Sequence, residues 1–166
     1  MANTNGDIMT IIYEGVGDIF DSPAQTVVCP VNCVGVMGSG LALAFKHKCP
    51  GLYTAYREEC KNGLLTVKNT FLYKPEYGPW VLCLPTKDHF RDPSKMEYIQ
   101  YNLENISRDY EKMGITSLAM TPIGCGLGRL DYHYNVRPLL YQYLDPIDLE
   151  VSILMESELY KARNIF

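Results

Sequence analysis

The sequence lacks long hydrophobic runs and paired-cysteine motifs. None of its apolar runs reaches the roughly 18–20 residues that a membrane span requires, and its start, MANTNGDIMTII, has neither the basic segment nor the apolar core of a secretion signal. Its six cysteines include no C-x-x-C pair and no zinc-finger spacing, and most of them lie inside apolar runs, where a thiol behaves as a small hydrophobic group. We therefore expect a protein of the reduced cytoplasm, without a bound metal.

An excess of positive charge is also missing. The 166 residues carry a net charge of −4, which excludes a protein that coats nucleic acid non-specifically, because such proteins neutralise many phosphates. Recognition of a single modified nucleotide is compatible with this charge, and basic residues cluster locally at 46–48 and 87–95. The length indicates one domain over residues 1–166, large enough to fold without disulfides.

Apolar runs and helical patterns alternate along the chain, without repeats or low-complexity segments. Strands are expected at 8–13, 25–31, 64–73, 80–85, 117–123 and 148–155, and helices at 41–48, 50–60, 93–113, 135–144 and 156–166. In the longest helix, Asp92 would be the N-cap, Pro93 the first residue and Gly114 the stop. This alternation predicts a largely parallel sheet with helices on both faces.

Two glycine-rich loops follow predicted strands. Their glycines are Gly35, Gly38 and Gly40 in VNCVGVMGSGLALAF (31–45), and Gly124, Gly126 and Gly128 in PIGCGLGRLD (122–131). Glycine lets a phosphate approach the backbone, and a helix N-terminus presents unpaired N–H groups, although tight turns alone would also favour glycine. The first loop is neither a P-loop nor a dinucleotide fingerprint, since its spacing is G-x-x-G-x-G. Because parallel strands end at one edge of a sheet, the two loops can enclose a diphosphate from two sides.

Two polar residues follow the first two predicted strands. Asp18, in GVGDIF, could accept hydrogen bonds from an adenine amino group or a ribose, or it could cap the next segment. Asn32 ends the second strand, where its amide suits ribose hydroxyls but equally suits a strand-end turn. The residues alone leave both alternatives open.

The motifs GDIF, VNCVGVMGSGLALAF and PIGCGLG together resemble the macrodomain family, which binds ADP-ribose. Three longer blocks in the chain are similar to the DarG-type macrodomain, the antitoxin of a DNA ADP-ribosylating toxin and a relative of the terminal ADP-ribose glycohydrolases. These blocks are VNCVGVMGSGLALAFKHKCPGLYTAYREEC, LPTKDHFRDPSKMEYIQYNL and IGCGLGRLDYHYNVRPLL. The resemblance, over residues 8–154, implies a three-layer α/β/α macrodomain with a mixed, largely parallel central sheet.

The same resemblance implies an ADP-ribosyl glycohydrolase that needs no cofactor. Its partners would be ADP-ribose and an ADP-ribosylated macromolecule, with DNA favoured, and no membrane. Two alternatives stay open: a phosphatase acting on ADP-ribose 1″-phosphate, and a reader that binds ADP-ribose without turnover. DarG carries a toxin-binding region after its macrodomain, for which these residues leave no room, so we expect a freestanding, monomeric enzyme.

Individual site residues follow from the resemblance as well. Asp18 and the backbone of Ile19 would hold the adenine, and Asn32 the distal ribose. Lys87, in PTK, would be the catalytic residue, attacking the anomeric carbon as a neutral amine or acting as a positioned electrostatic catalyst. The other expected substrate-binding residues are Cys33, Val34, Met37, Gly38, Ser39, Gly40, Leu41 and Thr86 around the first loop, and Gly124, Cys125, Gly126, Leu127 and Gly128 in the second.

One position departs from the terminal glycohydrolase pattern. There an Asp in the glycine loop resolves the lysine adduct, whereas this chain has Gly128, as in the DarG type. The nearest carboxylate, Asp131, could equally cap the following helix, so the resolving base stays unassigned.

Other polar and aromatic residues have alternatives of their own. His89 could shuttle protons or simply pack, and Arg91 could bind a phosphate or pair with a neighbouring aspartate. Tyr132 or Tyr134 could stack on a base near the ligand mouth.

Overall fold

The computed structural model describes residues 12–156, which contain one six-stranded sheet in the order β1-β6-β5-β2-β4-β3. The strands are β1 Ile12–Val16, β2 Thr26–Val31, β3 Phe71–Tyr73, β4 Trp80–Pro85, β5 Ser117–Met120 and β6 Glu150–Met155. Every neighbouring pair is parallel except β3 with β4, which is antiparallel. The expected mixed, largely parallel sheet is confirmed.

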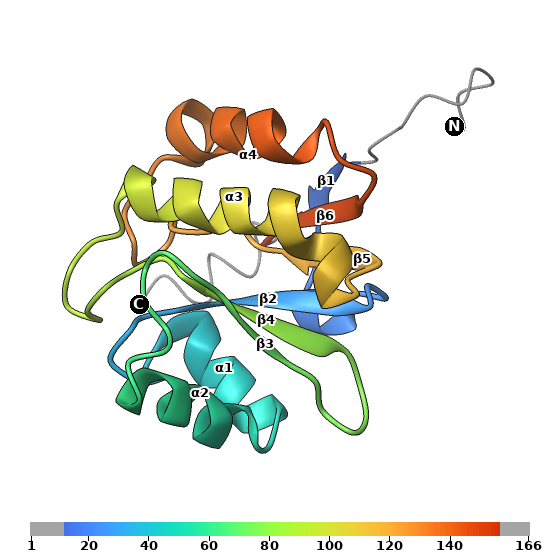
Figure 1. Ribbon diagram of the computed structural model, residues 1–166. Coiled ribbons are helices and arrows are strands. Elements are labelled where there is room, and N and C mark those ends of the chain that lie inside the picture. Colours follow the sequence, from blue (N-terminus) through green and yellow to red (C-terminus); the bar gives the residue numbers. More distant parts are fainter. Residues whose placement is uncertain (1–11, 157–166) are drawn as a thin grey trace.

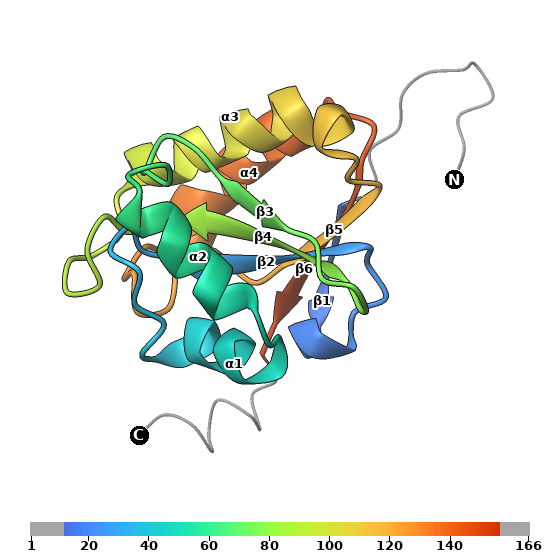
Figure 2. The same cartoon turned by 60° about the horizontal axis from the view of Figure 1, so that its bottom comes forward.

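Helices cover both faces of the sheet (Figure 1). On one face lie α1 (Gly40–Lys48) and α2 (Leu52–Lys61), which Figure 2 brings forward, and on the other lie α3 (Met96–Met113) and α4 (Arg137–Leu144). A short 3-10 helix, Ile19–Asp21, follows β1, and one π-helical turn, Tyr132–Val136, leads into α4. The three-layer α/β/α architecture is therefore confirmed.

The central strands are apolar on both faces because both faces are covered. In β2 and β4, TVVCPV and WVLCLP, alternate residues enter different cores. Val28 and Leu82 pair in register and join the core that contains Leu103 of α3. Cys29 and Cys83 also pair in register, and they join the core beneath α1 and α2. All six cysteines carry free thiols. Within residues 12–156, no helix combines the length and apolarity needed to cross a bilayer.

The longest helix begins at Met96, so the predicted N-cap at Asp92 and first residue at Pro93 are wrong. The reason is a tertiary hydrogen bond: the Ser94 N–H donates to the Gly128 carbonyl at 3.0 Å and ties this segment to the second glycine loop, so the extended Lys95 becomes the N-cap. The predicted stop at Gly114 is confirmed: its backbone is left-handed (φ 78) and its N–H donates to the carbonyls of the last turn.

Several strands are shorter than the sequence predicts. Strand β3 covers only the end of the expected 64–73, because Asn69 builds a turn by accepting from the Thr66 N–H (2.7 Å) and donating to the Leu64 carbonyl (2.6 Å). Strand β5 ends at Met120 and β6 begins at Glu150. The expected strand residues 8–11 and nearly all of the expected helix 156–166 lie outside the described part of the chain.

Glu14 ties the edge strand β1 to the helical layer above it. Its carboxylate accepts hydrogen bonds from Arg137 Nε (2.8 Å) and Nη2 (2.8 Å), from the Tyr132 hydroxyl (2.6 Å) and from the Tyr141 hydroxyl (2.9 Å). The hydrogen bonds from Arg137, with those from the two tyrosines, lower the pKa of Glu14 from 4.5 to about 2 despite opposing desolvation.

This lowered pKa predicts a loss of stability in acid. A carboxyl group whose pKa is depressed by folding stabilises the fold above its unfolded pKa, and this contribution disappears as the pH falls from 4.5 toward about 2. Because solvent screens the half-exposed Arg137, we expect Glu14→Gln to lower the free energy of unfolding by about 1–2 kcal/mol at neutral pH and by far less near the folded pKa. Urea unfolding of both proteins at the two pH values measures this, and an equal loss at both would contradict it.

Candidate active site

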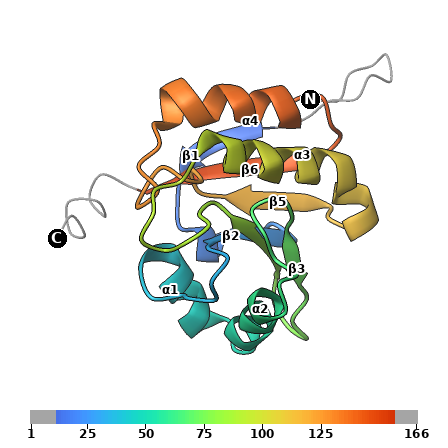
Figure 3. The same cartoon turned by 60° about the vertical axis from the view of Figure 1, so that its left-hand side comes forward.

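The expected binding loops gather at one edge of the sheet. Strands β5, β2 and β4 are neighbours and run parallel, so the segments that follow them, 121–131, 32–39 and 86–95, all leave from the carboxyl edge. Figure 3 turns this edge forward and shows the three loops together between the two helical layers. The structure thus brings both glycine loops and Lys87 to the same edge.

Asn32 organises the first glycine loop. It is 7% exposed, and its Oδ1 accepts from the N–H groups of Val34 (3.0 Å) and Val36 (3.4 Å) and from the Tyr56 hydroxyl (2.8 Å). Its Nδ2 donates to the Val36 carbonyl at 2.8 Å. Burial raises the pKa of Tyr56, so its hydroxyl keeps its proton and remains a donor. The turn-forming role of Asn32 is therefore observed, and its contact with a ribose stays a prediction.

Helix α1 begins inside this loop and points its N-terminus at the same edge. Ser39 is the N-cap, but its side chain makes no capping hydrogen bond, and Gly40 has a left-handed backbone with φ 57. The first N–H groups of a helix have no intrahelical partner and carry partial positive charge, which suits a phosphate. Met37, expected to contact substrate, is only 1% exposed as a whole residue, so its contact with a ligand stays a prediction.

The glycines of the second loop serve different purposes. A β-carbon on Gly128 would clash with Ser94 Oγ and lie 2.5 Å from the Gly124 carbonyl oxygen. A β-carbon on Gly126 would meet no atom within 4 Å. Gly128 is therefore required by packing, and the aspartate of the terminal glycohydrolase pattern has no space there. Asp131 instead caps the π-helical turn by accepting from the Tyr134 N–H at 2.8 Å, as one of its two interpretations predicts.

The two glycine loops approach each other through Leu127. A β-carbon on Gly40 would lie 3.3 Å from Leu127 Cδ1, so this 63% exposed side chain lies against the start of α1. The open backbone at Gly126 and the N-terminus of α1 therefore belong to one continuous surface.

Main-chain hydrogen bonds place Lys87 beside the first glycine loop. The Thr86 N–H donates to the carbonyl of Val31, the last residue of β2 (3.0 Å), and the Cys33 N–H donates to the Asp88 carbonyl (3.0 Å). The β2–β4 ladder thus continues past both strands, with the partly buried Lys87 between its last two bonds. Its position depends on backbone geometry, which side-chain substitutions leave intact.

The thiols at this edge are poor nucleophiles. Burial, together with the charge of Asp88, raises the pKa of Cys33 to about 12. Burial, together with the charge of Asp131, raises the pKa of Cys125 to about 11. Both thiols are protonated at neutral pH, so neither competes with the Lys87 amine as a nucleophile.

The family model described as Macro domain matches residues 28–137. This chain belongs to the macrodomain family. The structure of the Thermus aquaticus DarG macrodomain is 31% identical with a TM-score of 0.82, over 88% of this chain and 99% of that chain. The Thermosipho africanus DarTG structure in complex with ADP-ribose is 35% identical with a TM-score of 0.80, over 87% of this chain and 42% of that one. The expected likeness to DarG macrodomains is confirmed.

Among curated relatives, a Mycobacterium tuberculosis protein named DNA ADP-ribosyl glycohydrolase is 38% identical over 143 residues, which is 83% of this chain and 41% of that protein. This macrodomain spans about two fifths of the length of the first curated relatives that it matches.

Other predicted residues of the macrodomain take structural roles. Asp18 Oδ1 accepts from the Phe20 N–H at 2.9 Å, so the capping role is observed, while the adenine contacts expected of Asp18 and Ile19 stay predictions. Tyr132 is buried and binds Glu14, so its proposed stacking role is wrong.

Sequence reasoning also missed residues that shape the site. The Ser94 hydroxyl is buried beneath the second loop and has no hydrogen-bond partner within the described chain. Arg129 has φ 69, a left-handed backbone that no other non-glycine residue between positions 12 and 156 adopts. The sequence places Ser94 inside the predicted helix 93–113, which conceals its contact with the second loop. Nothing in the sequence indicates the left-handed backbone of Arg129.

A hollow at the opposite edge of the macrodomain suits an anionic ligand poorly. It measures about 590 Å³ and is lined by Glu111, Asp148 and Glu150 among other residues. Three carboxylates would repel a diphosphate, whereas the carboxyl edge offers backbone N–H groups and a lysine.

Proposed function

We propose that this macrodomain is an ADP-ribosyl glycohydrolase that binds ADP-ribose and releases it from DNA. The observation that carries the proposal is the placement of Lys87 by main-chain hydrogen bonds directly beside the first glycine loop, at the edge where that loop meets the second. Two relatives add support: one is named DNA ADP-ribosyl glycohydrolase, and another was solved in complex with ADP-ribose.

In this proposal the diphosphate lies between the α1 N-terminus and the open backbone at Gly126. Both supply fixed N–H donors, which need no reorganisation when the ligand binds. The adenine extends toward Asp18 and Ile19 beyond β1, and the distal ribose lies over the loop that Asn32 holds, next to Lys87. No metal or cofactor is required for binding in this arrangement.

The proposed chemistry starts with the neutral Lys87 amine attacking the anomeric carbon. A carbon–nitrogen bond to Lys87 forms as the glycosidic bond breaks, and the electron pair of the glycosidic bond leaves with the DNA base. The attached nitrogen then loses a proton, which neutralises the charge of the departing base. Water then adds to the same carbon and displaces the amine, which regenerates the enzyme and frees ADP-ribose. In the alternative, Lys87 remains charged and stabilises the departing base while water attacks directly.

A side-by-side assay of the wild-type protein tests the proposal. The substrates are ADP-ribosylated DNA, ADP-ribosylated protein and ADP-ribose 1″-phosphate, each monitored for its released product. We expect release from DNA to exceed release from the other two by at least about tenfold, a difference of about 1.4 kcal/mol in barrier height. Release of phosphate alone would identify a phosphatase, and binding of ADP-ribose without any release would identify a reader.

The proposed compartment is the cytoplasm, where thiols stay reduced. The free state of all six cysteines supports this proposal.

A further inference from the structure

Three consecutive side chains stack close to Lys87: the half-buried His89 and the exposed Phe90 and Arg91. The Phe90 side chain is 41% exposed, and its ring centroid lies 4.3 Å from that of His89 at an interplanar angle of 29°. The Arg91 guanidinium carbon lies 5.4 Å from the Phe90 centroid. His89 is engaged in this arrangement, because its Nδ1 accepts from the Arg91 N–H at 3.1 Å.

We propose that this stack, His89–Phe90–Arg91, is a platform for the unpaired nucleobase next to the ADP-ribosylated one. Proteins that bind single-stranded nucleic acid stack bases on exposed aromatic rings and place cations beside them. The inference rests on the proposed function and extends it: the preferred substrate is a single strand longer than one nucleotide.

The position of the platform favours a flanking base over a distant one. Lys87 Nζ donates to the main-chain carbonyl of Phe90 at 3.3 Å, so the reacting amine and the aromatic ring belong to one tight turn. A base attached to the sugar at Lys87 therefore has its chain neighbour within reach of Phe90. A base inside a duplex is already stacked on both faces, so only an unpaired base can use the platform.

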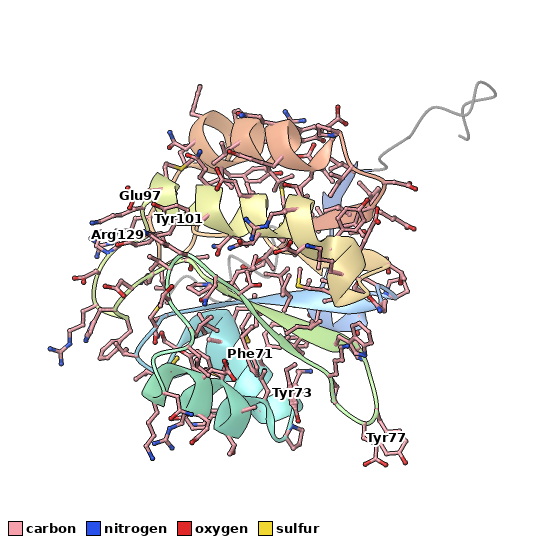
Figure 4. All side chains as sticks on the ribbon, viewed as in Figure 1. Phe71, Tyr73, Tyr77, Glu97, Tyr101 and Arg129 are labelled. Atoms are coloured by element: carbon pink, nitrogen blue, oxygen red, sulfur yellow. The ribbon has the colours of Figure 1, made fainter. Side chains whose placement is uncertain are left out.

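The local charge also suits a polyanion. In a chain of net charge −4, segment 86–95 carries three basic side chains, Lys87, Arg91 and Lys95, against two acidic ones. The exposed Arg129 adds a further cation beside this segment. It lies there because the Ser94 N–H donates a hydrogen bond to the carbonyl of Gly128, the residue before Arg129. In Figure 4, Arg129 lies at this edge of the molecule, whereas Tyr77, 83% exposed, lies at the far end. Tyr77 therefore provides a matched control: an exposed aromatic side chain away from the site.

The test measures ADP-ribose release from a modified mononucleotide, a modified single-stranded oligonucleotide and the same oligonucleotide in a duplex. For Phe90→Ala we expect KM on the single strand to rise by about 5- to 150-fold, the range that loss of one stacked base implies, with the mononucleotide unaffected. Phe90→Trp keeps a stacking ring and should restore the wild-type KM, and Tyr77→Ala should match the wild type on every substrate. Alanine retains the carbonyl that Lys87 binds, so the turn itself is preserved.

Two results would overturn the platform. One is an equal effect of Phe90→Ala on the mononucleotide and the single strand, which would mean that Phe90 only supports the turn around Lys87. The other is an unchanged KM on every substrate.

If the wild type releases nothing from any substrate, the proposed function fails, and anisotropy with an unmodified single-stranded oligonucleotide at low salt tests the platform separately. Weaker binding by Phe90→Ala than by Tyr77→Ala supports the platform, and equal binding by the two variants rejects it.

Discussion

Replacing Lys87 with alanine is expected to slow release of ADP-ribose from DNA by about 1,000-fold, equivalent to about 4 kcal/mol of barrier height. The variant removes the amine that we propose as the nucleophile, and the thiols of Cys33 and Cys125 cannot replace it because they are protonated at neutral pH. The glycine loops do not depend on the lysine side chain, because the bonds around it are main-chain bonds. The affinity for ADP-ribose should therefore stay within about tenfold, or about 1.4 kcal/mol.

The matched variant Lys87→Arg separates the two proposed roles of the lysine. Arginine keeps the positive charge but does not lose its proton at neutral pH, so it cannot attack as a neutral amine. If Lys87→Arg is inactive, the result supports Lys87 as a nucleophile. If Lys87→Arg keeps most of its activity, the result supports electrostatic catalysis by Lys87. Single-turnover kinetics measures the rate, and calorimetry with ADP-ribose measures the affinity. Full activity in Lys87→Ala would remove the lysine from the mechanism.

Gly128→Ala is expected to weaken ADP-ribose binding by more than about 30-fold and to destabilise the fold. The added carbon would press on the Gly124 carbonyl oxygen at 2.5 Å and on the Ser94 hydroxyl. Backbone cannot yield as a flexible side chain can, so the second loop must change its own shape between Gly124 and Gly128 and shift relative to Ser94. Overpacking of this kind costs about 1–3 kcal/mol of stability, and the displaced loop no longer presents its N–H groups to the diphosphate.

Gly126→Ala is the matched comparison within the same loop. Its β-carbon would meet nothing within 4 Å, so the free energy of unfolding should stay within about 0.5 kcal/mol of the wild type. Its methyl group would nevertheless stand where the diphosphate approaches, so affinity should fall without loss of stability. Urea unfolding and calorimetry on both variants measure the two effects. Wild-type stability and affinity in Gly128→Ala would contradict the packing described for this loop.

The layout of the fold can be predicted from the sequence because it depends on strong local signals. Continuous apolar runs such as TVVCPV and WVLCLP indicate strands covered on both sides, and glycine clusters directly after strands indicate loops at the carboxyl edge. The helix stop at Gly114 and the early Pro138 in α4 are equally local. These features required no knowledge of which segments pack together.

The errors arise where a tertiary contact overrides a local preference. Asp92 and Pro93 are good helix starters, but the bond between Ser94 and the Gly128 carbonyl delays the helix. The sequence makes Tyr132 a stacking candidate, but its hydroxyl donates a hydrogen bond to Glu14, 118 residues away. Nothing in the sequence marks Phe90, because the role of a lone phenylalanine in a loop depends on its exposure and its neighbours in the fold.

An NMR titration of the backbone amides with ADP-ribose tests the two-loop site most directly. We expect the amide resonances of Gly40, Leu41 and Gly126 to shift together with one affinity, accompanied by those of Asp18 and Ile19. Shifts confined to the acidic hollow around Glu111 and Asp148, or no shift at millimolar ADP-ribose, would contradict a ligand held between the two glycine loops.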